Sequence, residues 1–313
     1  MSELILHHYD ASPFTQRALR MLGLKRLAWH SVQMPMMPPK DGLVALTGGY
    51  RGTPVLQVGA ELFIDSQLIA RKLEQLHPTP SLFPAGDAGL QLAMVKWSDQ
   101  FFRSALKIVL GAMADQWPEP FRKDREHLFP DIDFATVGVE ASHWRSQFRA
   151  HAWLLEQQLS DGRAWLAGAA PSLADIQAHP FVAMMRGAMP EAAGELLAGF
   201  TRLAAWEQRM LGMGEGTRTE IDIAAAHAAA RAASPVKIAV DIDAHDAQRF
   251  TAGTQVVVEP DDTQRGGSVG ELVVLQPNEV AIRRTDPQVG TVVVHFPRLG
   301  YRVRAADRVR AAD

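Results

Sequence analysis

The sequence predicts a multidomain chain: an α/β segment first, an all-helical segment in the middle, and a small all-β segment at the end. Within the first 80 positions, apolar runs and helical spacing follow each other in the order β-α-β, then β-β-α. From Asp87 onward the apolar spacing is helical, and valine-rich alternation replaces it after Ser234-Pro235. With 313 residues, 47% of them hydrophobic, the chain is long enough to bury more than one core.

The elements of the first segment follow from its turn residues. Three prolines and a glycine in "MPMMPPKDG" break regular structure there, and Gly59-Ala60 marks a turn between two apolar runs. We expect strands at 3–9, 27–33, "TPVLQVG" and "AELFID", and helices at 13–24 and "SQLIARKLEQLH".

The later segments are delimited in the same way. Frequent Gly, Asp and Pro between valine-rich runs after residue 235 indicate short antiparallel strands that form a small barrel or sandwich. Helices are expected at 87–114, 136–160, 172–187, 190–198, 201–212 and 219–232. The predicted domains are 1–80, 87–215 and 235–313, with 216–234 as a helical linker.

Charge and composition exclude several classes of function. The net charge of −3 gives no global field for nucleic acid or an anionic membrane. We see no apolar run of about 18 residues for a membrane span and no secretory signal, so a cytoplasmic location is expected. The absence of cysteine excludes disulfides, cysteine-ligated metals and a thiol nucleophile from the protein itself.

The stretch "DASPFTQRALRM" places a serine and a proline where the first strand gives way to a helix. Pro13 suits the first helical position because it has no N–H group to leave unpaired. Ser12 then precedes the helix, where backbone N–H groups and the helix dipole favour an anion. Plain capping by Ser12 explains the same pattern, and on this stretch alone it is the better interpretation.

Two further turns also allow both a structural and a ligand-binding interpretation. Thr53-Pro54 precedes a strand, and a cis bond there would turn the Thr53 backbone toward a ligand, although an ordinary trans proline fits as well. Asp65-Ser66 begins a helix, where Ser66 either caps or faces a carboxylate while Asp65 accepts from an ammonium group.

The ordered set of strand–Ser-Pro–helix, Thr-Pro–strand and Asp-Ser–helix resembles the N-terminal domain of the glutathione transferase superfamily. The resemblance implies a thioredoxin-like domain followed by a helical domain, over roughly residues 1–215. "PSLADIQAHP" resembles the capping box of that helical domain, with Asp175 accepting from the Ser172 N–H group.

The resemblance also implies residue roles toward glutathione, the expected co-substrate. Ser12 would hydrogen-bond the sulfur and favour the thiolate, with Tyr9 as a second candidate. Thr53, before Pro54, would pair with the cysteinyl backbone, and Asp65 and Ser66 would hold the γ-glutamyl end. The remaining predicted binding residues are Pro13 and Phe14, in a serine version of the omega-type Cys-Pro-Phe pattern, and Lys40 for the glycine carboxylate.

Without cysteine, the chain cannot form the mixed disulfide of cysteine-type members. We therefore expect a serine-type glutathione transferase that activates the thiolate for attack on an apolar electrophile, in keeping with detoxification. Family resemblance further implies a homodimer. The alternative is a non-catalytic binding or scaffold protein that uses its C-terminal β domain for protein–protein contacts.

Two further groups of side chains have candidate binding roles. In such proteins the electrophile lies between the two domains, so Trp97 and Phe101 could line its pocket, although core packing explains them as well. Asp241, Asp243 and His245 share one side of an extended chain and could bind a hard cation, but a solvated turn is favoured and no metal is expected.

Overall fold

The computed structural model describes residues 3–233 and 240–306. The chain falls into two compact units. Unit 1 contains the described parts of 1–15, 28–72 and 217–313, and unit 2 contains 16–27 and 73–216. The division passes within the helices α1 (Pro13–Leu24) and α3 (Ser66–Leu76). Whether residues 235–313 fold as a domain of their own stays a prediction.

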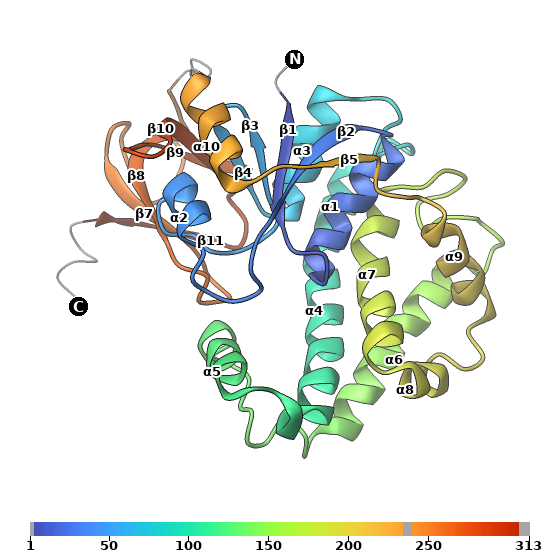
Figure 1. The fold of residues 1–313 in the computed structure, drawn as a ribbon. Coiled ribbons are helices and arrows are strands. Elements are labelled where there is room, and N and C mark those ends of the chain that lie inside the picture. The colour runs from blue at the N-terminus through green and yellow to red at the C-terminus, as the bar shows by residue number, and fades with distance from the viewer. Residues whose placement is uncertain (1–2, 234–239, 307–313) are drawn as a thin grey trace. The chain divides into compact units, whose positions relative to one another are not determined.

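Unit 1 is built on one sheet, which combines strands from both ends of the chain (Figure 1). The order of the described strands is β11-β7-β8-β9-β10-β4-β3-β1-β2-β5, and β6 pairs with β8. Their bounds are β1 Leu4–His8, β2 Ala28–Gln33, β3 Val55–Val58, β4 Glu61–Ile64, β5 Thr217–Glu220, β6 Asp241–Ile242, β7 Gln255–Pro260, β8 Ser268–Gln276, β9 Glu279–Asp286, β10 Gly290–Pro297 and β11 Tyr301–Ala305.

The C-terminal strands continue the N-terminal sheet. β10 pairs in parallel with β4, with His295 opposite Phe63, and the Val293 N–H donates to the Ala60 carbonyl at 2.9 Å. The pairs β7·β8, β8·β9, β9·β10 and β7·β11 are antiparallel, as predicted. The predicted fold class is confirmed, but closure into a barrel is not, because the described strands follow an open order from β11 to β5.

The apolar core of this unit joins the two ends of the chain. It includes Leu62 and Ile64 of β4, Val292 and Val294 of β10, and Leu46 of α2 (Asp41–Thr47). The helix α10 (Ile223–Ala232) contributes Ala230 and packs against α2 and β10. Segments some 200 residues apart therefore share one buried core.

Two α-helices and one strand of the described residues were not predicted. The helix α2 begins within "MPMMPPKDG", at Asp41, because the prolines end at Pro39. β5 pairs with β2 at one edge of the sheet and reads Thr-Arg-Thr-Glu, so it offers no apolar alternation. The helix α5 (Glu119–Leu128) is mostly charged and lacks an apolar stripe that would reveal it.

Unit 2 is helical, as predicted. Its long helix α4 (Ala88–Ala112) packs against α6 (Ala141–Gln158) and α7 (Leu173–Ala188), where Phe101, Phe148 and Phe181 are fully buried. The Phe101 ring centroid lies 5.0 Å from that of Phe148 and 6.0 Å from that of Phe181. Beyond α1 and α3, the elements are α4 Ala88–Ala112, the 3₁₀ turn Ala114–Gln116, α5, α6 Ala141–Gln158, α7 Leu173–Ala188, α8 Pro190–Leu196 and α9 Thr201–Leu211.

The predicted capping box lies at the start of α7. The Ser172 N–H donates to Asp175 Oδ2 at 3.0 Å, and the Ser172 hydroxyl donates to the same oxygen at 2.7 Å. Asp175 Oδ1 accepts from the Leu166 N–H at 2.8 Å and from Trp206 Nε1 at 2.7 Å. The prediction is confirmed, and the network extends well beyond the helix start.

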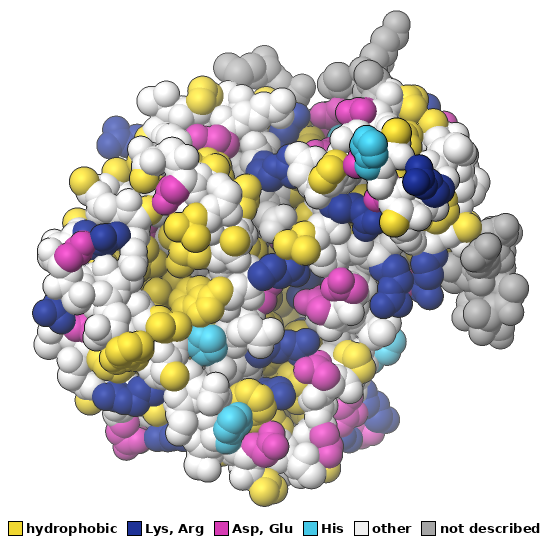
Figure 2. All heavy atoms as spheres, turned by 180° about the vertical axis from the view of Figure 1, so that it is seen from behind, with side chains coloured by type: hydrophobic (Ala, Val, Ile, Leu, Met, Phe, Trp, Pro, Cys, Tyr) yellow, Lys and Arg dark blue, Asp and Glu magenta, His cyan; other side chains and the backbone are white. Residues whose placement is uncertain are grey.

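The described helices include none with the length and hydropathy that crossing a membrane requires. Figure 2 shows one face of the molecule, on which basic and acidic side chains are interspersed among apolar ones.

Candidate functional site

Three of the predicted turns lie at the same end of adjacent strands in unit 1. In the antiparallel pairs, His7 of β1 lies opposite Val55, and Val55 of β3 lies opposite Ile64. The chain therefore leaves β1, enters β3 and leaves β4 at one edge. That edge brings together the turns 9–12, 53–54 and 65–66, and the Thr53-Pro54 bond is cis.

Ser12 is the N-cap of α1. Its Oγ accepts from the Thr15 N–H at 3.3 Å, and its own N–H donates to the Tyr9 carbonyl at 3.1 Å. The capping interpretation is thus confirmed, and Ser12 is 2% exposed. A hydroxyl that accepts from a backbone N–H keeps its own proton to donate.

Tyr9 and Lys40 lie together at the same edge. The Lys40 ammonium is 5.4 Å from the Tyr9 ring centroid, and Lys40 is the residue just before α2. Lys40 is largely buried, whereas Tyr9 is partly exposed. The Lys40 ammonium group therefore lies beside the turn 9–12, which leads to Ser12.

Asp65, rather than Ser66, caps α3. Asp65 Oδ1 accepts from the Gln67 N–H at 2.9 Å, and the Asp65 carbonyl accepts from the Ile69 N–H at 3.0 Å. Asp65 has a φ of 74°, in the left-handed region that aspartate tolerates better than most residues. Ser66 is the first residue of the helix and is buried.

Sequence reasoning missed two tyrosines beside Asp65. The Tyr301 hydroxyl donates to Asp65 Oδ2 at 3.4 Å, and both Tyr301 and Tyr50 belong to the apolar core of unit 1. Burial raises the pKa of each phenol, and the Asp65 carboxylate adds to the effect. Pro297 and Gly300 in "HFPRLGYRV" suit the turn between β10 and β11, but no local pattern shows what Tyr301 contacts.

Arg265 was missed as well. It lies between β7 and β8, half-buried, with its guanidinium 5.4 Å from the Phe14 ring centroid. Burial lowers the pKa of this guanidinium, but Tyr50, Asp262 and other nearby groups outweigh burial and raise it. Arg265 is charged at any working pH, and no local sequence pattern pointed to it.

The two candidate residues of α4 lie in unit 2. Phe101 is fully buried, whereas Trp97 is partly exposed, with its ring centroid 6.0 Å from that of Phe101. His151 of α6 stacks on Phe101 at 5.3 Å, and burial lowers the pKa of its imidazole. Contact with an electrophile stays a prediction for both Trp97 and Phe101.

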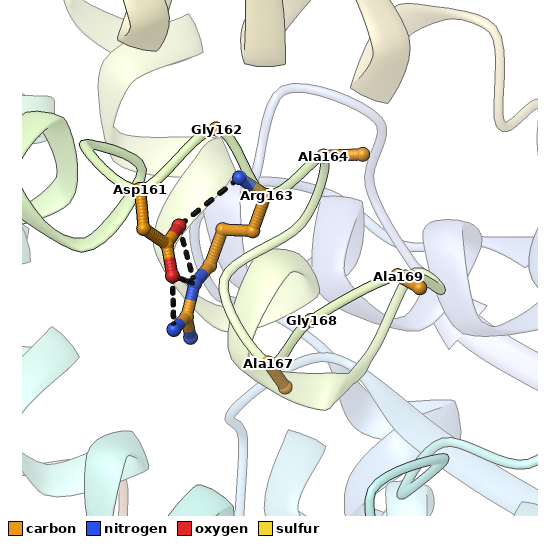
Figure 3. Close-up of a pocket in the computed structure, with 7 residues that line it drawn as sticks. All are labelled: Asp161, Gly162, Arg163, Ala164, Ala167, Gly168 and Ala169. Atoms are coloured by element: carbon orange, nitrogen blue, oxygen red, sulfur yellow. Dashed lines mark hydrogen bonds and ion pairs between the residues drawn. The ribbon is translucent and has the colours of Figure 1, made fainter.

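A pocket in unit 2 lies in the loop that follows α6 (Figure 3). Hydrogen bonds from Arg163 hold the pKa of Asp161 down to about 2, and the guanidinium points at that carboxylate. The charges of Asp161 and Arg163 are thus paired with each other. The remaining lining is small and apolar, without a predicted site residue: Gly162, Ala164, Ala167, Gly168 and Ala169.

The acidic stretch near residue 243 forms a turn. Asp243 Oδ1 accepts from the His245 N–H at 2.8 Å, and Asp241 Oδ1 accepts from Gln276 at 2.8 Å. Among the residues that the structure describes, no three His, Asp or Glu side chains are grouped as a metal site would require.

Family models match both main parts of the chain. The N-terminal domain of glutathione S-transferase matches residues 6–81, and the C-terminal domain matches residues 110–209. No curated protein matches the chain.

Solved structures extend the similarity to nearly the whole chain. A GST-like protein from Pseudomonas syringae shares 35% sequence identity, with a TM-score of 0.79 over 97% of this chain and 100% of that one. A tau class enzyme from mango shares 18% identity and a TM-score of 0.52, over 66% of this chain and 88% of that one.

A glutathione S-transferase of Ceriporiopsis subvermispora, solved in complex with glutathione, also shares 18% identity and a TM-score of 0.52. That match covers 67% of this chain and 97% of the other. At these identities the two matches show the fold alone, and they leave about a third of this chain without a counterpart. The relative from Pseudomonas syringae has no such gap. The chain therefore belongs to the glutathione S-transferase family.

Proposed function

We propose that unit 1 binds glutathione along the edge where the turns 9–12, 53–54 and 65–66 meet. The observation that carries this proposal is the strand register, which brings a helix start, a strand start and a second helix start to one edge. Helix N-termini attract anions, and Asp65 offers a carboxylate to an ammonium group. Glutathione carries a thiol that can ionise, two carboxylates and one ammonium group, so its chemistry suits this edge.

Ser12 is our candidate for the contact with sulfur. Its hydroxyl proton and the positive end of α1 would both favour the thiolate over the thiol, whose pKa is about 8.5 when unperturbed. Tyr9, at the end of the same strand, is the second candidate. Thr53 and Pro54 would flank the cysteinyl backbone, and Lys40 would pair with the glycine carboxylate.

Conjugation of an apolar electrophile is the reaction that we infer, because a thiolate held by a hydroxyl is a nucleophile and the chain has no cysteine for disulfide exchange. Trp97 and Phe101 are the candidates for contact with the electrophile. We propose a cytoplasmic homodimer. The alternative, a non-catalytic member of the family, would keep the fold and lack thiolate formation.

The test is calorimetric titration with glutathione, combined with ultraviolet absorbance of the bound thiolate near neutral pH. We expect binding and a thiolate band in the unmodified protein, and loss of the band in both Ser12→Ala and Ser12→Gly. Glycine keeps most of the capping preference, whereas alanine costs about 1 kcal/mol of helix stability. If Ser12 contacts the sulfur, both variants lose the thiolate band. If its capping bond also matters, only Ser12→Ala loses stability, so the two roles can be told apart.

Two results would overturn parts of this proposal. If Tyr9→Phe abolishes the band and Ser12→Gly keeps it, Tyr9 is the donor. If the unmodified protein does not bind millimolar glutathione, the non-catalytic alternative is correct.

A further inference from the structure

The C-terminal strands of unit 1 reach the edge at which we place glutathione. β10 runs parallel to β4, with His295 opposite Phe63, so β10 ends at Pro297 beside the end of β4. β11 begins at that edge with Tyr301, which pairs with Pro260 at the end of β7. The loop 261–267, which follows β7, therefore begins at the same edge as Asp65.

Backbone contacts fix the loop 261–267 against the turn that precedes Thr53. The Arg51 N–H donates to the Arg265 carbonyl at 2.8 Å. Gly49 and Gly266 approach so closely that a Cβ on Gly266 would lie 2.4 Å from the Gly49 carbonyl oxygen. This packing holds the Arg265 backbone in one place.

The Arg265 side chain brings a positive charge to the predicted site. Its guanidinium lies over Phe14, two residues after Ser12, and interacts electrostatically with Asp65 and Tyr301. The Tyr301 hydroxyl in turn contacts Asp65. Arg265 is half-buried as a residue, and its guanidinium also hydrogen-bonds the Tyr50 hydroxyl. The edge therefore carries a carboxylate and a guanidinium side by side.

An α-amino acid group is complementary to that pair of charges. The γ-glutamyl end of glutathione carries a carboxylate and an ammonium group on one carbon atom. A guanidinium binds a carboxylate through two parallel N–H donors, and a carboxylate accepts from an ammonium group. We propose that Arg265 binds the α-carboxylate of the γ-glutamyl group, while Asp65, held by Tyr301, accepts from its ammonium group. This inference rests on the proposed function.

The proposal gives the C-terminal β segment a direct part in ligand binding. Asp65 and Ser66 lie within the first 80 residues, whereas Arg265 and Tyr301 lie in the last 50. The glutathione site would then be incomplete without the C-terminal strands.

The experiment compares three ligands by calorimetry: glutathione, γ-glutamylcysteine, and 4-aminobutyryl-cysteinylglycine, which lacks the α-carboxylate. In Arg265→Gln we expect affinity for the first two to fall about 10-fold or more, and affinity for the third to stay as in the unmodified protein. Arg265→Lys should recover part of the loss. Arg302→Gln is the matched control, because Arg302 is exposed on β11 directly after Tyr301. It should bind all three ligands normally.

The other possible results of this titration would contradict either the role of Arg265 or the whole glutathione site. An equal loss for all three ligands in Arg265→Gln would assign Arg265 a structural role, and no loss would exclude it from the site; either overturns this inference and leaves the proposed function intact. Failure of the unmodified protein to bind glutathione would overturn both. Thermal unfolding of each variant shows whether the fold is retained.

Discussion

Two aspartates at helix starts, one in each unit, use their carboxylates differently. Asp175 of unit 2 is fully buried and accepts four hydrogen bonds, all of 3.0 Å or less, from Leu166, Ser172 and Trp206. Asp65 of unit 1 is half-buried, and it accepts one backbone bond at 2.9 Å and a longer bond from Tyr301 at 3.4 Å. Both accept hydrogen bonds at a helix start, but only Asp175 has filled its acceptor capacity.

The difference indicates which carboxylate serves the fold and which can serve a ligand. A carboxylate has about four acceptor positions, so the four bonds of Asp175 leave no place for a further donor. Burial raises the pKa of Asp175, and the donors act against that rise. Asp65 keeps acceptor positions at a partly exposed edge, beside the cation of Arg265.

The largest effect that we expect comes from Asp175→Asn. Each oxygen of Asp175 accepts from two donors, so an amide turns its NH₂ group either toward the Leu166 and Trp206 N–H groups or toward Ser172, whose hydroxyl can rotate to accept but whose N–H cannot. In the second, more favourable orientation the Ser172 N–H and the amide N–H that faces it are both left unpaired. At about 2 kcal/mol for each buried unpaired group, the free energy of unfolding should fall by about 4 kcal/mol. Urea denaturation measures this value. A loss below 1 kcal/mol would show that the network is not as tight as its distances indicate.

Acid should destabilise both units. Burial lowers the pKa of His7 in unit 1 and of His179 in unit 2 to about 4, from 6.5 in an unfolded chain. Between pH 6.5 and pH 4 the unfolded state binds more protons, so stability is fully present above pH 6.5 and falls with pH by about 3 kcal/mol for each histidine.

Denaturation at several pH values checks this prediction. His7→Asn and His179→Asn should each flatten the pH dependence of the free energy of unfolding. An unchanged pH profile in either variant would mean that the corresponding imidazole titrates normally in the folded state.

A glycine substitution tests whether the C-terminal loop is tied to unit 1 at Gly49. Gly266 has a φ of 81°, and a Cβ there would also press on the Gly49 carbonyl, whereas Gly253 has a φ of 82° with no atom near such a Cβ. Both alanine variants bear the strain of a left-handed backbone, but only Gly266→Ala adds the clash. We expect it to be less stable than Gly253→Ala by about 2 kcal/mol in urea denaturation. Equal losses would argue against tight docking of the loop.

Local signals predicted most of the fold and three of the turns. The Ser12-Pro13 helix start, the turn at Gly59-Ala60 and the Ser172–Asp175 box depend on residues close in sequence, and they appear as predicted. Their physics is local, since caps and turns involve neighbours within about four residues.

Pairing between distant segments could not be predicted in this way. The parallel contact of β10 with β4 joins Val293 to Glu61, and no pattern in either strand specifies that partner. Arg265 and Tyr301 reach Asp65 only because of this pairing. The sequence therefore located one half of the candidate site and left the other half without a chemical role.

The smallest effect that we expect concerns Asp65 itself, and it tests the comparison with Asp175 directly. Asp65→Asn keeps an oxygen for the Gln67 N–H and removes the charge that would attract the ammonium group of glutathione. We expect affinity for glutathione to fall about 10-fold, or about 1.4 kcal/mol, with little change in the free energy of unfolding. Asp222→Asn is the control, because Asp222 also caps a helix in unit 1, through a bond of 2.8 Å from the Ala225 N–H. If both variants lose the same stability and neither loses affinity, Asp65 serves the fold alone, as Asp175 does, and the distinction between the two carboxylates fails.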